Sequence, residues 1–258
     1  MQKGKNAVYQ TAIDRPSETA EAKASLCEER PFTFFILSML AGAMIGIGSM
    51  FLICTGRDYP APWNRLIGAA GFPLALMLVI FAGAELFTGN VLCTGLGLWT
   101  KKLKLSTFLK LWILCWLGNL LGSLLMAAIF YGTGLAAGEA AGQYISAVWA
   151  SKTQASFLSL CFRGMLCNAL VCFAVWCSKT MKDEIGKIVI IFFCIFVFVA
   201  CGYEHSIANM SLLGYQLIAG GGNLSGFFYN LFSVTLGNIL GAYLFLILPY
   251  MAAGGKNS

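Results

Sequence analysis

The last quarter of the chain is a long apolar run with one charged interruption. Between Ile188 and Asn257 the only Asp, Glu, Lys, Arg or His residues are Glu204, His205 and Lys256, and His205 is the single histidine of the chain. Such a run is far longer than the roughly 20 residues that cross a bilayer. Ionisable side chains at bilayer depth are costly and usually functional. The segment around Glu204 and His205 is therefore the first candidate for a functional site.

A similar segment occurs earlier in the chain. Glu204 follows Glu85 by 119 residues, and Asn209 follows Asn90 by the same distance. The triplet Leu-Gly-Asn at 236–238 follows an identical triplet at 117–119, again by 119 residues. Two separate motifs displaced by one common distance indicate an internal duplication.

The composition is that of a membrane protein with several crossings. Hydrophobic residues make up 59% of the chain and charged residues only 11%, more apolar surface than a soluble core of this size can hide. The net charge of +6 does not indicate nucleic-acid binding, because the basic residues form short clusters at the ends of apolar segments. The first thirty residues mix acidic and basic side chains, so we expect no cleaved signal peptide.

The ten cysteines contain no C-x-x-C pair, and most fall inside apolar runs. Small buried apolar side chains are the preferred interpretation over disulfides or metal ligands. With one histidine and no cysteine-histidine cluster, we expect neither a protein-held metal nor a cofactor.

The apolar runs predict an all-α membrane protein with six transmembrane helices. Two runs, 66–100 and 185–218, are too long for one crossing: the first would span roughly 52 Å as a straight helix, so a break is expected in each. The predicted order is a soluble, partly helical segment at 1–31, crossings at 32–54, 66–100, 107–131, 156–178, 185–218 and 226–252, and a tail at 253–258, with a loop of small residues at 132–155.

The basic residues orient these crossings. Thirteen of the 17 Lys and Arg residues lie in the N-terminal segment, at 101–110, at 179–187 or at the C-terminus. These regions share one side only if each interrupted run crosses once, and the positive-inside rule then places both termini in the cytoplasm of a cell-membrane protein. Repeats of three crossings, about 32–131 and 156–252, run in opposite directions, as in channels and transporters with broken helices.

The breaks predict a pathway for a solute. Backbone groups released at a break find no partner in lipid, so broken segments line a protein-enclosed or watery cavity. Half-helix N-termini directed into that cavity favour an anion. His205 adds a group that can donate a hydrogen bond or a proton near neutral pH.

Several polar residues have two interpretations. Glu85 and Glu204 either accept hydrogen bonds from the opened backbone, which we favour, or touch the solute. Lys152, in the predicted outer loop, is either solvated or attracts anions at the pore mouth. Arg163 either extends to the interface or serves the pathway. The G-N-x-x-G motif of Asn238 indicates close helix packing, and this asparagine is compatible with binding as well.

Two stretches resemble a known family. Residues 84–90 (AELFTGN) and 202–210 (GYEHSIANM) look like the two signatures of the formate/nitrite transporter family, with further agreement at 164–168 (GMLCN) and 235–238 (TLGN). The resemblance covers about residues 32–250. It implies an aquaporin-like protomer, assembled as a pentamer with one pore per subunit, in a lipid bilayer and without nucleic-acid partners.

The resemblance also implies roles for individual residues. His205 would lie close to Thr88 between two apolar constrictions. The cytoplasmic constriction would comprise Phe72, Leu76 and Phe198, and the outer one Leu86, Phe87 and Val171. Lys152, Asn168 and Asn238 would attract and hold the anion, while Glu85, Asn90, Glu204 and Asn209 are the polar residues of the broken helices.

The implied function is passage of small monovalent anions of weak acids, nitrite or formate, with a proton and through His205. The local sequence looks closer to the nitrite branch, and hydrosulfide or a short carboxylate are the alternatives within the family. A neutral-solute channel of aquaporin type is a further alternative, but its breaks carry Asn-Pro-Ala turns, whereas valine and methionine follow Asn90 and Asn209 here. An enzyme or a purely structural subunit would not require mirrored polar breaks.

Overall fold

The computed structural model describes residues 2–254, with the surroundings of side chains from Ile13 to Ala253, so residues 255–258 of the predicted tail lie outside the described part. Most of the described residues are helical, and none of them forms a strand. In chain order the elements are α1 (Gln2–Glu29), α2 (Pro31–Asp58), α3 (Trp63–Gly71), α4 (Pro73–Phe81), α5 (Phe87–Trp99), α6 (Leu105–Gly132), α7 (Glu139–Thr153), α8 (Phe157–Thr180), α9 (Glu184–Ala200), α10 (Ser206–Ile218), α11 (Leu224–Ala242), the π-helical turn η1 (Tyr243–Ile247) and α12 (Leu248–Gly254).

Five segments of the described chain are long and apolar enough to cross a membrane: Pro31–Asp58, Trp63–Phe81, Leu105–Gly132, Phe157–Thr180 and Leu224–Ala253. The predicted run at 185–218 is divided into α9, α10 and a break between them. The run at 66–100 is likewise broken between α4 and α5. Both predicted interruptions are therefore present.

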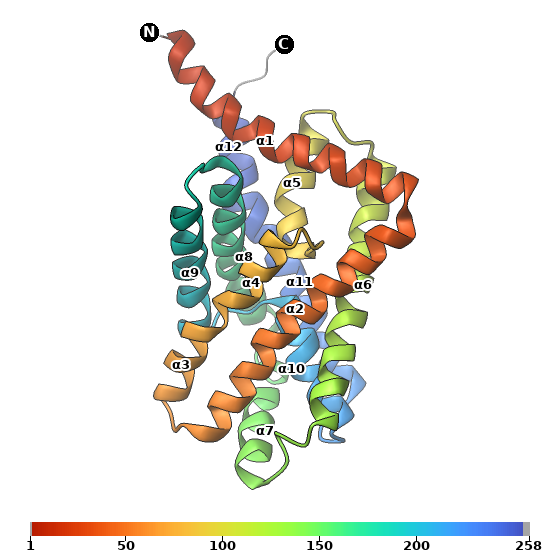
Figure 1. Ribbon diagram of the computed structural model, residues 1–258, viewed down its shortest axis with the longest axis vertical. Coiled ribbons are helices and arrows are strands. Elements are labelled where there is room, and N and C mark those ends of the chain that lie inside the picture. Colours follow the sequence, from red (N-terminus) through yellow and green to blue (C-terminus); the bar gives the residue numbers. More distant parts are fainter. Residues whose placement is uncertain (1, 255–258) are drawn as a thin grey trace.

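The two helices that belong to none of the predicted crossings, α1 and α7, lie at opposite ends of the bundle (Figure 1). Helix α1 lies across the end where α12 also lies, and α7 lies at the opposite end; we call these the α1 end and the α7 end. Helix α1 packs on the bundle, since Ala20 and Cys27 are fully buried and the Cβ of Ala20 faces Gly97 of α5.

The prediction of a loop throughout 132–155 was wrong, because residues 139–153 form α7. Its alanine content favours a helix. Glu139 in its first turn and Lys152 in its last turn also complement the helix dipole. The glycines on either side concealed this signal.

The predicted close packing at the G-N-x-x-G motifs is confirmed. A Cβ on Gly122 of α6 would come 1.8 Å from the carbonyl oxygen of Met39 on α2. A Cβ on Gly241 of α11 would come 2.2 Å from the carbonyl oxygen of Met165 on α8. In both pairs the absence of a side chain brings two backbones into contact, as is common between transmembrane helices.

We expect Gly122→Ala to destabilise the protein by about 1–3 kcal/mol, because the added methyl group forces α2 and α6 apart. Thermal unfolding in detergent measures this. Gly132→Ala is the matched control on the same helix, since a Cβ there meets nothing within 4 Å. Equal melting temperatures for the two variants would contradict the packing argument.

Candidate functional site

The two breaks have the same backbone conformation. Gly83 and Gly202 have φ values of 70° and 72°, a region that glycine enters without a Cβ penalty. In each break the residue after the glycine donates its N–H to a carbonyl five residues earlier, at 3.0 Å in both cases. Helices α5 and α10 start three residues further on, at Phe87 and Ser206.

An asparagine holds each break in place. The Oδ1 of Asn119 accepts the N–H of Phe87 at 2.8 Å, and the Oδ1 of Asn238 accepts the N–H of Ser206 at 2.9 Å. Their Nδ2 groups donate to the carbonyl oxygens of Glu85 at 2.8 Å and of Glu204 at 2.9 Å. Backbone groups that lipid cannot satisfy thus find partners within the protein, and Asn238 here has a structural role.

The same asparagines reach the first long helix of their own half. Asn119 donates to the carbonyl of Ser38 at 2.7 Å, and Asn238 donates to that of Gly164 at 2.9 Å. Gly164 follows Ser38 by 126 residues. Helices α2 and α8 are thus related by a spacing of 126, whereas the breaks are related by 119, and this second spacing was not found from the sequence.

Each glutamate is buried and paired with a lysine. Glu85 and Glu204 are both 4% exposed. Lys23 of α1 pairs with Glu85, and Lys152 of α7 pairs with both carboxylate oxygens of Glu204, at 2.9 and 3.0 Å. Lys152 lies on a helix and is ion-paired, so the interpretation as a solvated loop lysine was wrong. The Lys23 contact was not predicted.

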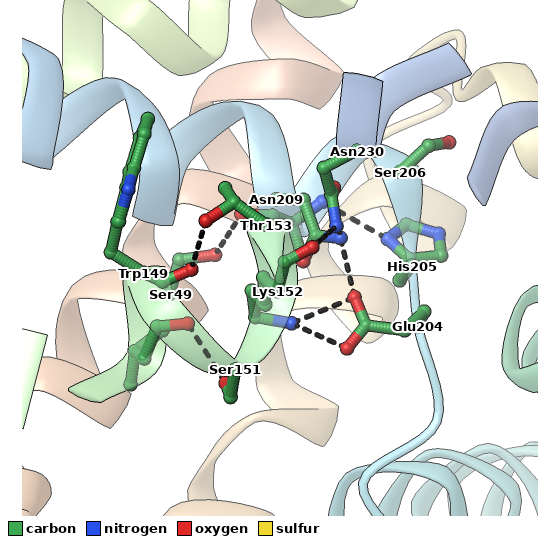
Figure 2. Close-up of polar contacts among 12 residues, drawn as sticks. Ser49, Trp149, Ser151, Lys152, Thr153, Glu204, His205, Ser206, Asn209 and Asn230 are labelled. Carbon is green, nitrogen blue, oxygen red and sulfur yellow. Dashed lines mark hydrogen bonds and ion pairs between the residues drawn. The ribbon is translucent and has the colours of Figure 1, made fainter. Parts of the chain in front are cut away.

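Asparagines complete both carboxylate sites. Asn90 donates to Glu85 at 2.8 Å, and Asn209 donates to Glu204 at 2.6 Å. Asn209 also donates to the Oδ1 of Asn230 on α11 at 2.8 Å, as Figure 2 shows. The preferred structural role of the two glutamates is therefore consistent with every contact they make.

The two breaks differ in the residue that precedes the half-helix, which is His205 in the second break and Leu86 in the first. His205 follows Leu86 by 119 residues, and each of them is the N-cap of its half-helix. The Nδ1 of His205 accepts the N–H of Ala208 at 3.2 Å, so the proton of the neutral ring is on Nε2. That atom is 2.9 Å from the Oγ1 of Thr88, and Nε2–H therefore donates to the threonine.

Two buried polar atoms close to this pair have no partner within the described part of the protein. Asn168 donates to the carbonyls of Thr88 at 3.4 Å and of Asn238 at 2.7 Å, but its Oδ1 has no donor. The Oγ of Ser206, the residue after His205, is also unpaired. Buried polar atoms are almost always hydrogen-bonded, to protein or to a bound molecule.

Aromatic rings flank His205 on one side. The ring of Phe198 lies 5.9 Å from that of His205 and 5.7 Å from that of Phe72. Phe72 lies between α3 and α4, and the chain runs through these two helices from the α7 end toward the first break (Figure 1). Leu76 follows one turn later on α4 and is buried as well.

Leu86 lies on the other side. It lines a cavity of about 100 Å³ together with Lys23 of α1 and Lys179 at the end of α8. Val171 lies before Lys179 on α8 and is buried. The ring of Phe87 packs on that of Trp112 of α6. Leu86 therefore lies toward the α1 end of His205, and Phe72 and Phe198 lie toward the α7 end. With the cytoplasmic N-terminus that the sequence predicts, Leu86 would be on the inner side, so this orientation and the predicted sides of the two constrictions do not both hold.

The described residues contain no group of three or more His, Cys, Asp or Glu side chains that could hold a metal ion. Arg163 is exposed on α8, and its carbonyl accepts the N–H of Glu204 at 3.3 Å.

Comparisons with known proteins agree over nearly the whole chain. A family model described as formate/nitrite transporter matches residues 10–252. The chain is 37% identical to a probable formate transporter of Methanothermobacter thermautotrophicus, over 93% of this chain and 97% of that protein. It is 33% identical to the nitrite transporter NirC of Escherichia coli, over 96% and 94%.

Solved structures are similar as well. An ion channel of the FNT family superposes with a TM-score of 0.89 at 34% identity, covering 94% of this chain and 98% of that one. A pentameric formate channel with formate bound superposes with a TM-score of 0.74 at 28% identity, covering 87% and 98%.

Proposed function

This chain belongs to the formate/nitrite transporter family, and we propose that it is a membrane channel or transporter for small monovalent anions of weak acids, with nitrite and formate as the first candidates. The observation that carries the proposal is the hydrogen-bonded pair of His205 and Thr88. It lies between the two broken helices and is fully enclosed by protein, with His205 3% exposed and Thr88 0%.

The surroundings of the pair suit an anion. Helices α5 and α10, each 13 residues long, both begin at the breaks. Their free N–H groups and partial positive charge are therefore presented at the same place. Within the described part of the chain, the Oγ1 of Thr88 bonds only to His205 among side chains, so its hydroxyl hydrogen is available to an acceptor.

The apolar residues on both sides of His205 exclude a bare anion, because an unpaired charge in low dielectric is costly. We propose that the solute crosses this part as the neutral acid. The tautomer of His205 favours water as the proton source. A ring with its proton on Nε2 has none to release until Nδ1 is protonated, and that would displace the N–H of Ala208.

For the architecture we propose six crossings in two inverted repeats, about 32–131 and 156–252, with the second and fifth crossings broken. The paired contacts at spacings of 119 and 126 support this, and α1 and α7 supply one lysine to each half. We further propose that both termini are cytoplasmic and that the protein is a pentamer in the cell membrane. The proposal of a pentamer rests on the similarity to the solved structure of a pentameric formate channel.

The proposal is tested with purified protein in liposomes. We expect uptake of formate and nitrite to rise as the external pH falls, because more of each solute is then the neutral acid. Competition among formate, nitrite, hydrosulfide and acetate ranks the substrates. Swelling driven by glycerol, without anion uptake, would support the neutral-solute alternative and overturn the proposal.

A further inference from the structure

The cavity at the α1 end carries a positive charge that the rest of the site does not balance. Its walls come from α1, from the first break and α5, and from the end of α8, including Lys23, Asn90, Cys93, Val175 and Lys179. Leu86, which precedes α5, also lines it. A solute in this cavity therefore stands at the entrance to the apolar part of the proposed pathway.

The two lysines of the cavity differ in their partners. Lys23 pairs with Glu85, and that carboxylate also accepts from Asn90. Lys179 is half-buried, and none of the five ion pairs of the described residues includes it. The cavity is thus lined by two lysines, and the one carboxylate next to it, that of Glu85, is paired with Lys23.

The C-terminal end of α8, next to Lys179, does not neutralise the charge of this lysine. The C-terminal carbonyls of a helix carry partial negative charge, but those of Lys179 and Thr180 accept hydrogen bonds from Nη1 of Arg15, at 3.0 Å each. Arg15 brings a further cation to this corner, and the ammonium of Lys179 keeps its attraction for an anion.

The opposite half has no counterpart of Lys179. At the spacing of 126 that relates α8 to α2, the matching residue is Ile53, which is buried among apolar side chains. At the α7 end, the charge of Lys152 is balanced by its ion pair with Glu204. The two ends are therefore alike in their lysine-glutamate pair and unlike in this second lysine.

We propose that the cavity between Lys23 and Lys179 is a binding site for a small monovalent anion, and that it gives the α1 end a higher affinity for the transported anion than the α7 end. This rests on the proposed function and adds to it a sided, charge-based binding step. The excess charge belongs to Lys179, so that side chain sets the difference.

The test compares Lys179→Gln with the unsubstituted protein. Formate uptake is measured in intact cells and in everted membrane vesicles, with the exposed end assigned by protease access to α1. We expect the apparent KM for formate offered at the α1 end to rise about tenfold, as for loss of a charge-assisted hydrogen bond. The apparent KM at the α7 end should stay unchanged, and Lys179→Arg should behave like the unsubstituted protein.

Lys182→Gln is the matched control, because Lys182 is exposed three residues further on and its loss changes the net charge equally. An equal rise of the apparent KM in both lysine variants would reduce the effect to surface charge and overturn the inference. An unchanged apparent KM at both ends for Lys179→Gln would also overturn it. Absence of formate and nitrite transport by the unsubstituted protein would instead refute the proposed function.

Discussion

Replacing Glu204 by leucine is expected to destabilise the protein by about 3–5 kcal/mol, because it leaves the ammonium of Lys152 buried without a counter-charge. Lys152 has only 14% of its side chain exposed, and Glu204 only 5%. For a chain of this size the change corresponds to a melting temperature lower by roughly 6–20 °C, measured by thermal unfolding in detergent.

A second substitution separates lost charge balance from lost packing. In the Glu204→Leu background, Lys152→Met removes the unpaired charge, and we expect it to restore a large part of the stability, since apolar replacements of buried pairs are often neutral. Glu184→Leu is the matched control. It removes the partner of Lys187, but Glu184 has 68% of its side chain exposed, and exposed pairs contribute little.

If Glu204→Leu and Glu184→Leu lowered the melting temperature equally, the buried pair would not be a structural element. Failure of Lys152→Met to restore stability would point instead to the contact between Glu204 and Asn209 as the main contribution.

Much of the broken-helix arrangement could be predicted from the sequence, because its residues lie close together in the chain. Gly83 and Glu85 are two residues apart, as are Gly202 and Glu204, so the turn and the polar group it presents form one readable motif. The 119-residue spacing then relates the two motifs, and the single histidine marks the point where they differ.

The lysine partners could not be predicted in the same way. Lys23 lies 62 residues from Glu85 and Lys152 lies 52 residues from Glu204. Both stand on helices outside the apolar runs, where a lysine is usually solvated. A signal did exist, since each glutamate at bilayer depth requires a counter-charge and each half has one polar helix available to supply it.

The conflict between the predicted orientation and the predicted sides of the two constrictions has a geometric origin. A resemblance assigns residues to a ring but does not give the direction of the half-helix that carries them. Helix α4 approaches the break from the α7 end, and α5 leaves it toward the α1 end (Figure 1). Phe72, before the break, therefore lies on the far side from Lys23, which shares a cavity with Leu86.

His205→Phe is expected to lower the initial rate of formate uptake roughly 10- to 100-fold. This is the size of effect expected when a hydrogen bond to a group that carries or gains a charge is lost. Phenylalanine keeps a ring beside Phe198 but has neither the Nε2–H that donates to Thr88 nor the Nδ1 that accepts from Ala208. The lost cap costs about 1 kcal/mol, too little to unfold the protein.

His205→Asn separates the cap from the imidazole. Asparagine is a good N-cap and replaces the acceptor for the N–H of Ala208, but it lacks the Nε2–H that donates to Thr88. We expect this variant to melt like the unsubstituted protein and still to lose transport in liposomes, measured as initial uptake rates at several external pH values. If His205→Asn kept both the rate and the pH dependence, the Nε2–H of the imidazole would not be needed for passage of the solute. Unchanged uptake in both variants would remove His205 from the pathway altogether.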